Sequence, residues 1–282
     1  MDFRDVRRTV ITAMFSDDVL YEKFVLKGGN ALDIVHGLGG RASLDIDLSI
    51  EEDFENLEEV KSRMLKALAD RFDSAGFVVF DFTFGRKPPE PPPNNPEWGG
   101  YFAEFKIIEK TAHQKFAADS NALRRNATTI ARGDKRKFRI EVSKHEYCTG
   151  KQKVELDDFT IYVYSLPMIA VEKLRAICQQ MNEYALRLHP TARARDFFDI
   201  HAILSQGNVD LTHPDTLELI IRMFAAKSVP IELLARIGQY RAFHAIDWPS
   251  VVDSVSREVR DFDYYFDYVI SKVNQLEALW KE

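Results

Sequence analysis

Long apolar runs, cysteines and an excess of positive charge are all lacking in this sequence. No stretch approaches the roughly 20 apolar residues that a membrane-spanning helix needs, and the first ten residues lack the apolar core of a secretion signal. The two cysteines, Cys148 and Cys178, are too few for a disulfide framework and do not have metal-ligand spacing. We therefore expect a cytoplasmic protein with ordinary thiols and no membrane contact.

The net charge is acidic, with one local exception. A formal charge of −6 argues against a nonspecific coat for nucleic acid, because phosphate binding depends on clustered cations. Within residues 124–139, however, seven cations stand against a single acid, Asp134. The cations are Arg124, Arg125, Arg132, Lys135, Arg136, Lys137 and Arg139. Such a run is typical of a solvated surface or of a polyanion site, and the sequence leaves both open.

Several common catalytic motifs are also missing. The seven histidines form no H-E-x-x-H pair, and neither a G-x-S-x-G elbow nor a P-loop G-K-[S/T] sequence occurs. These absences exclude the commonest zinc-protease, hydrolase and P-loop NTPase interpretations.

The periodicity of apolar residues indicates a mixed first part and a helical second part. Period-two patterns or short apolar runs predict strands near 24–26, 44–50, 77–84, 101–108, 138–143 and 161–164. Helical spacing predicts helices over 54–73, 111–125, 166–181, 191–206, 215–227, 230–242 and 251–280. We expect an α+β protein, with a mixed sheet and flanking helices in residues 1–164 and a helical domain in 165–282. The proline-rich segment 88–96 should be an exposed loop.

Two adjacent glycines, Gly28 and Gly29, separate the apolar run 24–26 from a helical pattern that begins at Ala31. Glycine lets backbone amides approach a phosphate closely, and the N-terminus of a following helix adds a favourable dipole. This strand, turn and helix arrangement predicts a phosphate-binding turn.

Acidic residues follow on the next predicted strand. Apolar and polar residues alternate over 44–50, so Asp45 and Asp47 should project from one face. Carboxylates are ligands that Mg²⁺ prefers, and nucleotidyl transfer uses divalent cations to neutralise and orient a triphosphate. Glu141 alternates in the same way within 138–143, and is our candidate for a third metal ligand if the two strands are neighbours.

These segments together resemble the AbiEii toxin family of DNA polymerase β-like nucleotidyltransferases, from about residue 24 to about residue 205. The first shared motif is Leu26-Lys27-Gly28-Gly29-Asn30-Ala31-Leu32 followed by Arg41-Ala42-Ser43-Leu44-Asp45-Ile46-Asp47-Leu48. The later motifs are Ile140-Glu141-Val142, then Glu172-Lys173-Leu174-Arg175-Ala176, and finally Arg193-Ala194-Arg195-Asp196-Phe197-Phe198-Asp199-Ile200.

The resemblance implies an enzyme that uses an NTP with Mg²⁺ or Mn²⁺ and takes residues of the helical domain into its active-site cleft. The implied catalytic residues are Asp45, Asp47, Lys173 and Asp196. The implied nucleotide contacts are Lys27, Gly28, Gly29, Asn30, Ser43, Lys173 and Arg195. Asn30 stands where the family usually has Thr or Ser. The alternative interpretation of Lys173, Asp196 and Asp199 is a structural ion-pair network between two helices, which also places acids and bases at helical spacing.

Our leading hypothesis is the toxin of a toxin–antitoxin pair, which transfers a nucleotide to an RNA such as tRNA. The basic run 124–139 would guide the polyanion, and a cognate antitoxin would be a protein partner. One alternative is a small-molecule nucleotidyltransferase of the antibiotic-modifying kind, whose acceptor pocket would be acidic. Another is a catalytically silent nucleotide-binding module, in which Asn30 has weakened phosphate capture.

Overall fold

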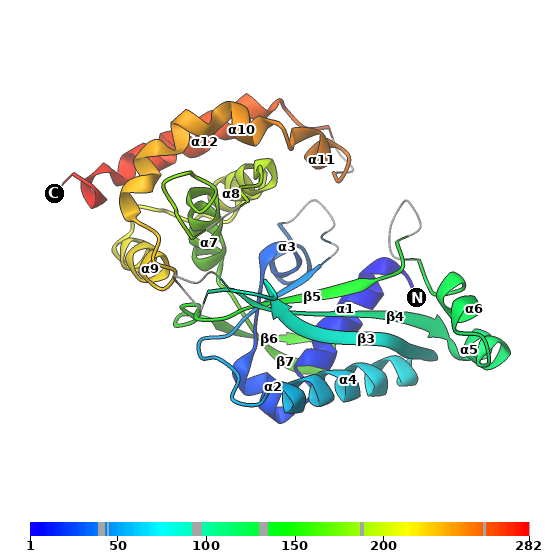
Figure 1. Cartoon of the computed structure of the whole chain (residues 1–282). Helices are drawn as coiled ribbons and strands as arrows, with labels where there is room; N and C mark the ends of the chain where they lie inside the picture. The colour runs from blue at the N-terminus through cyan, green and yellow to red at the C-terminus, as the bar shows by residue number, and fades with distance from the viewer. Residues whose placement is uncertain are drawn as a thin grey trace. The chain divides into compact units, whose positions relative to one another are not determined.

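The computed structural model describes residues 1–38, 43, 45–91, 98–129, 135–186, 189–255 and 258–281 (Figure 1). The chain forms two compact units, which we describe separately. The sheet unit comprises Met1–Asn30, Ser43–Lys144 and Gln152–Val163. The helical unit comprises Ala31–Ala42, His145–Lys151 and Tyr164–Glu282.

A mixed seven-stranded sheet forms the centre of the sheet unit, in the order β3-β4-β5-β2-β1-β7-β6. Its strands are β1 (Val25–Lys27), β2 (Ile46–Ser49), β3 (Phe77–Lys87), β4 (Gly100–Glu109), β5 (Phe138–Ser143), β6 (Gln152–Leu156) and β7 (Phe159–Val163). The pairs β2·β5 and β1·β7 are parallel, whereas the others are antiparallel. The predicted α+β class with a mixed sheet is confirmed.

Helices α1 (Phe3–Met14) and α4 (Leu57–Ser74) cover one face of the sheet (Figure 1). The other helices of the sheet unit are α2 (Asp18–Lys23), α3 (Gly28–Asn30), α5 (Lys110–Phe116) and α6 (Ser120–Arg125). Helix α1 packs against α4, and α4 packs against β3. On β4, Tyr101, Ala103 and Phe105 are buried, and Phe105 contacts Phe72 of α4 at 6.0 Å between ring centroids. We call the opposite face, which carries the intervening residues, the site face.

The helical unit is built on α7 (Leu166–Cys178), α8 (Ala194–Gln206), α9 (Pro214–Ala225) and α12 (Phe262–Val273). Helix α7 packs on α8 and α9, and α8 packs on α12, where the rings of Phe197 and Phe266 stack at 5.0 Å. Shorter elements are η1 (Ala31–Val35), η2 (Ile231–Tyr240), α10 (Arg241–Ala245), α11 (Trp248–Val252) and η3 (Asn274–Leu279). None of the described helices combines the length and apolarity of a transmembrane segment.

Four details differ from the predicted elements. The expected helix 111–125 is two helices, because the side chain of Asp119 accepts hydrogen bonds from two backbone amides and starts a new helix. The expected helix 251–280 is interrupted in the same way by Asp261, which caps α12. Residues 231–240 form a 3₁₀ helix instead of an α-helix, and β6 was missed because its residues are mostly exposed and polar. Most of the predicted loop 88–96 lies outside the described residues.

Candidate active site

A row of registered residues crosses five strands on the site face. Strand β2 lies between β1 and β5, and β4 and β3 follow. Residues that pair directly across strands share a face of the sheet. The row consists of Lys27, Asp47, Glu141, Phe102 and Gly85. The strand adjacency on which the prediction for Glu141 depended is therefore present, whereas its role as a metal ligand stays a prediction.

Gly28 brings the turn after β1 against the acidic strand. Its φ of +69° lies in the left-handed region, and a Cβ at this position would come within 2.4 Å of the Asp47 Oδ2 atom. Any side chain here would strain the backbone and displace the carboxylate. Only glycine allows both the turn and the close approach. The second glycine of the turn, Gly29, is buried in α3.

Asn30 connects the acidic segment to the first helix. Its side chain is fully buried. The Nδ2 atom donates to the carbonyl of Asp45 at 2.6 Å, and Oδ1 accepts from Arg7 Nη1 at 2.9 Å. Ser43 donates to the same carbonyl at 3.4 Å. A single hydroxyl on a shorter side chain would not span both partners, so the asparagine has a structural role of its own.

Charges are unevenly distributed around the acidic pair. Asp45 is exposed and immediately precedes β2, so it lies outside the strand that was expected to carry it. Partial desolvation raises the pKa of the Asp45 carboxyl, and the negative charge of Glu141 raises it further. Glu141 is paired with Lys87, and with Arg139 at 3.6 Å. Lys27 is buried and donates to Ser143 at 3.1 Å.

Among the residues that the structure describes, no cluster of three His, Cys, Asp or Glu side chains converges as a complete metal site. Glu141 would have to exchange its cationic partners before it could bind a metal. Two aspartates nevertheless suit Mg²⁺, which is usually held by one or two carboxylates together with substrate phosphates and water. The pKa of Asp45 is raised first by desolvation and then by the charge of Glu141, and a bound cation would oppose both by stabilising the ionised carboxylate.

In the helical unit, Lys173 lies in a buried ion-pair cluster. Its Nζ atom is 2.9 Å from Asp196 Oδ1 and 2.7 Å from Asp199 Oδ2, and all three side chains are buried. Arg193 approaches Asp196 at 3.3 Å. The aspartate face of α8 therefore anchors Lys173. Arg195, which the sequence resemblance implied as a nucleotide contact, is exposed and donates to Ser250 at 3.2 Å.

His244 is a member of this cluster that the sequence did not indicate. It is fully buried, and its Nδ1 atom accepts a hydrogen bond from the backbone of Arg193 at 3.1 Å. Burial lowers the pKa of His244 to about 4, although the charge of Asp196 opposes that shift. A lone histidine in a helix has no sequence signal that would distinguish it from an ordinary core residue.

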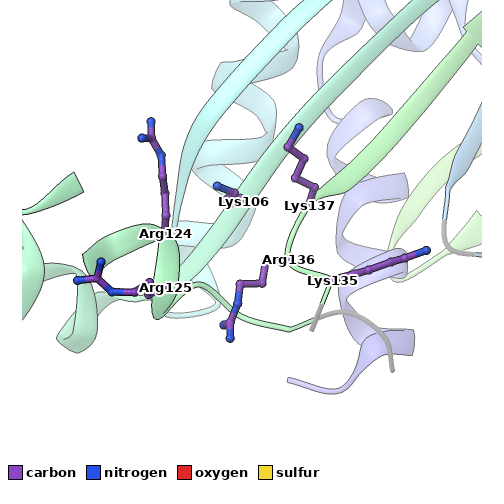
Figure 2. Close-up of a pocket in the computed structure, with 6 residues that line it drawn as sticks. All are labelled: Lys106, Arg124, Arg125, Lys135, Arg136 and Lys137. Atoms are coloured by element: carbon purple, nitrogen blue, oxygen red, sulfur yellow. The ribbon is translucent and has the colours of Figure 1, made fainter. Parts of the chain in front are cut away.

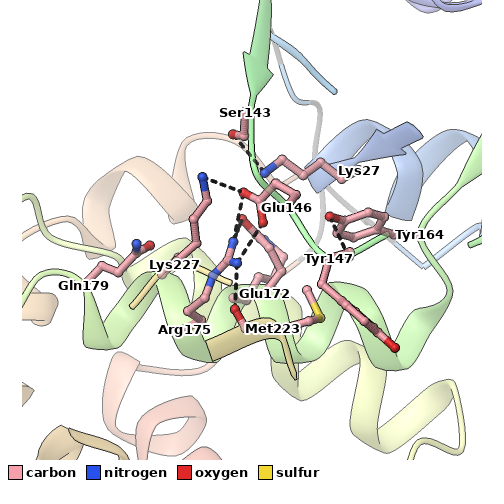
Figure 3. Close-up of polar contacts among 12 residues, drawn as sticks. Lys27, Ser143, Glu146, Tyr147, Tyr164, Glu172, Arg175, Gln179, Met223 and Lys227 are labelled. Atoms are coloured by element: carbon pink, nitrogen blue, oxygen red, sulfur yellow. Dashed lines mark hydrogen bonds and ion pairs between the residues drawn. The ribbon is translucent and has the colours of Figure 1, made fainter. Parts of the chain in front are cut away.

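A second buried ion pair was also missed (Figure 3). Arg175 donates to both oxygens of Glu146, at 2.7 and 3.1 Å, and to the carbonyl of Met223 at 3.1 Å. Lys227 lies 3.7 Å from the same carboxylate. This network fixes the segment 145–151 to the helices α7 and α9. Arg175 of the motif Glu172-Lys173-Leu174-Arg175-Ala176 is therefore buried within the helical unit and has no exposed surface to offer a substrate.

The basic run contributes to an open pocket of about 740 Å³ on the sheet unit (Figure 2). The described residues that line the pocket are all cations: Lys106, Arg124, Arg125, Lys135, Arg136 and Lys137. Lys106 and Arg124 both pair with Asp81, at 2.9 and 2.7 Å, and the Arg124 hydrogen bond is the main reason that the pKa of Asp81 falls to about 2. Lys137 pairs with Glu104 at 2.8 Å.

Membership of this pocket was only partly predictable. Lys106 joins it from β4 and was not part of the predicted basic run. Arg139 belonged to that run, but it lies on β5 beside Glu141. Arg132 lies outside the described residues.

A mixed sheet that presents a glycine turn beside an Asp-x-Asp pair is typical of nucleotidyltransferases. The family model described as nucleotidyl transferase AbiEii toxin of type IV toxin–antitoxin systems matches residues 10–268. The chain therefore belongs to this family and is a nucleotidyltransferase. The match continues to residue 268, well beyond residue 205, where the resemblance noted in the sequence ended.

Three solved structures are similar over most of the chain. MenT4, a nucleotidyltransferase toxin from Mycobacterium tuberculosis, is 13% identical, covers 99% of this chain and 92% of its own, and has a TM-score of 0.44. JHP933 from Helicobacter pylori is 15% identical over 99% and 97%, with a TM-score of 0.42. An antigenic nucleotidyltransferase-like protein from Paracoccidioides brasiliensis is 13% identical over 90% and 93%, also at 0.42. No curated protein matches significantly. The family assignment rests on the family model.

Proposed function

We propose that this toxin transfers a nucleoside monophosphate from an NTP to an RNA such as tRNA, in a reaction that depends on Mg²⁺ or Mn²⁺. The observation that carries the proposal is the row on the site face. It places Asp47 beside the glycine turn that follows β1 and beside Glu141 on β5, with Asp45 immediately before β2. The proposed substrates imply a cytoplasmic reaction, and the family implies a cognate antitoxin.

Asp45 and Asp47 would hold the divalent cation, and Glu141 would join them after exchanging Lys87 and Arg139. A bound cation would neutralise the triphosphate and stabilise its leaving oxygens. The protein's own contribution is to fix these carboxylates. Asn30 holds the backbone carbonyl of Asp45, as described above, and the register of β2 and β5 sets Asp47 opposite Glu141.

The NTP phosphates would lie against the turn formed by Lys27, Gly28 and Gly29, with Asn30 and Ser43 beside it. Backbone amides at such a turn can approach an anion closely. As the family resemblance implies, we also assign Lys173 and Arg195 to nucleotide binding. Asp196 would position Lys173. Residues 165–282 would then contribute to catalysis and to folding, because Lys173 is also an ion-pair partner of two buried acids.

The basic pocket supports an RNA acceptor over a small molecule. Six cations around one depression match a phosphate backbone, whereas an aminoglycoside acceptor is itself cationic and would require acidic groups. The structural use of Asn30 also weakens the alternative of a silent module, because its replacement of a hydroxyl has a reason other than lost phosphate binding.

The test is incubation with Mg²⁺, each radiolabelled NTP in turn, and total tRNA. Asp45→Ala and Asp47→Ala should each reduce labelling by about 100-fold or more, since even the groups that support metal ligands contribute about 10- to 100-fold. Asp70→Ala is the matched control, because Asp70 is an exposed aspartate on α4 that pairs with Lys66 of the same helix. Equal labelling by the wild type and both site variants would refute the assignment.

Expression in a bacterial host tests the toxin function separately. The wild type should arrest growth, and Asp47→Ala should relieve the arrest at an equal protein level. An arrest that persists in the variant would show that toxicity has another origin.

A further inference from the structure

One aromatic residue, Phe102, interrupts the charged residues of the site face. It pairs with Glu141 on one side and with Gly85 on the other. Its ring lies over Gly85, since a Cβ there would be 3.4 Å from the Phe102 Cε1 atom. The neighbouring side chains of β4 on this face are Glu104 and Lys106, and Phe102 is only half-buried. The ring therefore does not belong to the core on the opposite face.

Arg139 flanks this ring. Its guanidinium carbon is 5.9 Å from the ring centroid of Phe102. Hydrogen bonding to Glu104, at 3.1 Å from Nε, holds the guanidinium in place. A half-exposed ring with an adjacent guanidinium is a recurrent means of stacking single-stranded nucleobases. Neither group is used by the proposed metal and phosphate contacts.

The position of the ring indicates whether it would stack on a base of the acceptor or on the base of the NTP. Neighbouring strands lie about 4.8 Å apart, so Phe102 is two strands, or about 10 Å, from Asp47. The glycine turn lies on the opposite side of Asp47, on β1. Phosphoryl transfer needs the attacking and leaving oxygens roughly in line, so the acceptor enters from the side away from the triphosphate. That is the side of β4, which also carries Lys106 of the basic pocket.

We propose that Phe102, flanked by Arg139, is the platform on which the terminal nucleobase of the RNA acceptor stacks. The inference rests on the proposed function and adds the residue that orients the acceptor end. The cations of the pocket would bind the backbone without sequence preference, whereas the ring would position the last nucleotide beside Glu141 and Asp47.

The test compares Phe102→Leu with Phe102→Trp. Stacking of one base on an aromatic ring contributes about 1–3 kcal/mol, so Phe102→Leu should raise both the KM and the Kd for tRNA by about 5- to 150-fold. Phe102→Trp keeps an aromatic face and should remain near the wild type. The KM for NTP should stay within about twofold in both variants, because the ring lies away from the proposed phosphate turn.

Phe84→Leu is the matched control. Phe84 is registered with the buried Ala103, and its ring stacks on Tyr101 at 5.6 Å on the other face of the same sheet. This variant makes the same chemical change and should leave RNA binding unaltered. Fluorescence anisotropy with labelled tRNA measures Kd without turnover, and thermal unfolding confirms that each variant is folded.

Two results would overturn the platform. One is an unchanged Kd and KM for tRNA in folded Phe102→Leu. The other is a higher KM for NTP with tRNA binding intact, which would assign the ring to the incoming nucleotide. Failure of the proposed function looks different, because the wild type itself would then label no RNA.

Discussion

Replacement of Gly28 by alanine would test how the glycine turn controls Asp47. The structure gives this position two constraints, a left-handed φ of +69° and an approach of 2.4 Å between the added Cβ and Asp47 Oδ2. Gly37 shares the first constraint, with a φ of +68°, but an added Cβ there would meet nothing within 4 Å. The pair of variants Gly28→Ala and Gly37→Ala therefore isolates the contact with Asp47.

The two constraints should affect different quantities. A left-handed conformation costs a residue other than glycine roughly 1–2 kcal/mol, so both variants should lose about that much free energy of unfolding. The contact at Gly28 falls 1.0 Å short of the 3.4 Å at which ordinary contact begins (3.4 − 2.4). Because the nearest atom is the end of a side chain, Asp47 can rotate away. Displacement of a catalytic group by about 1 Å can reduce the rate by about 100-fold.

Urea unfolding and the labelling assay measure the two effects separately. We expect similar losses of stability in both variants, and a loss of kcat/KM of about 100-fold in Gly28→Ala alone. Both assays should be run at a temperature where each variant is fully folded. Equal kcat/KM in the two variants would refute the conclusion that Gly28 positions Asp47. A much larger loss of stability in Gly28→Ala would show that the carboxylate cannot rotate away.

Two further predictions concern the buried cluster of the helical unit. Lys173→Met should lower the free energy of unfolding by about 3–5 kcal/mol, because it removes the cation that the buried Asp196 and Asp199 share. A loss below about 1 kcal/mol in urea unfolding would contradict this account. His244 has a pKa of about 4 in the folded chain. Since its ordinary pKa is about 6.5, the unfolded chain binds more protons as the pH falls from about 6.5 to 4, and stability should drop by about 3 kcal/mol in that window. His244→Asn should lose this part of the pH dependence, and identical changes in unfolding free energy between pH 7 and pH 4 in both proteins would disprove it.

The sequence was a good guide where local periodicity decides the structure. Alternation within residues 138–143 placed Glu141 on one face, and the same pattern assigned Asp47 to a strand face before any pairing was known. Strand order is a long-range property, so the adjacency of β2 and β5 had to be assumed. Asp45 shows the limit of the pattern, since the strand begins only at the following residue.

Contacts between distant segments were beyond prediction from sequence. Lys106 joins the basic pocket because β4 lies beside the residues that lead into β5, and no local pattern marks it. In the sequence, Phe102 cannot be distinguished from the other apolar residues of its strand. Only the register of β4 and β5 shows that it lies beside Glu141. Asn30 was interpreted through the hydroxyl it replaces, because the partner that explains it, Arg7, lies in a separate helix.

The bridge from Arg7 through Asn30 to the carbonyl of Asp45 also has an evolutionary consequence. A relative with serine or threonine at position 30 would lose the amide oxygen that receives the guanidinium, and a buried arginine at position 7 would then lack that partner. Positions 7 and 30 should therefore vary together, with arginine accompanying asparagine and a smaller or apolar residue accompanying the hydroxyl. The identity of residue 7 in the first helix should therefore follow the identity of residue 30 in the glycine turn.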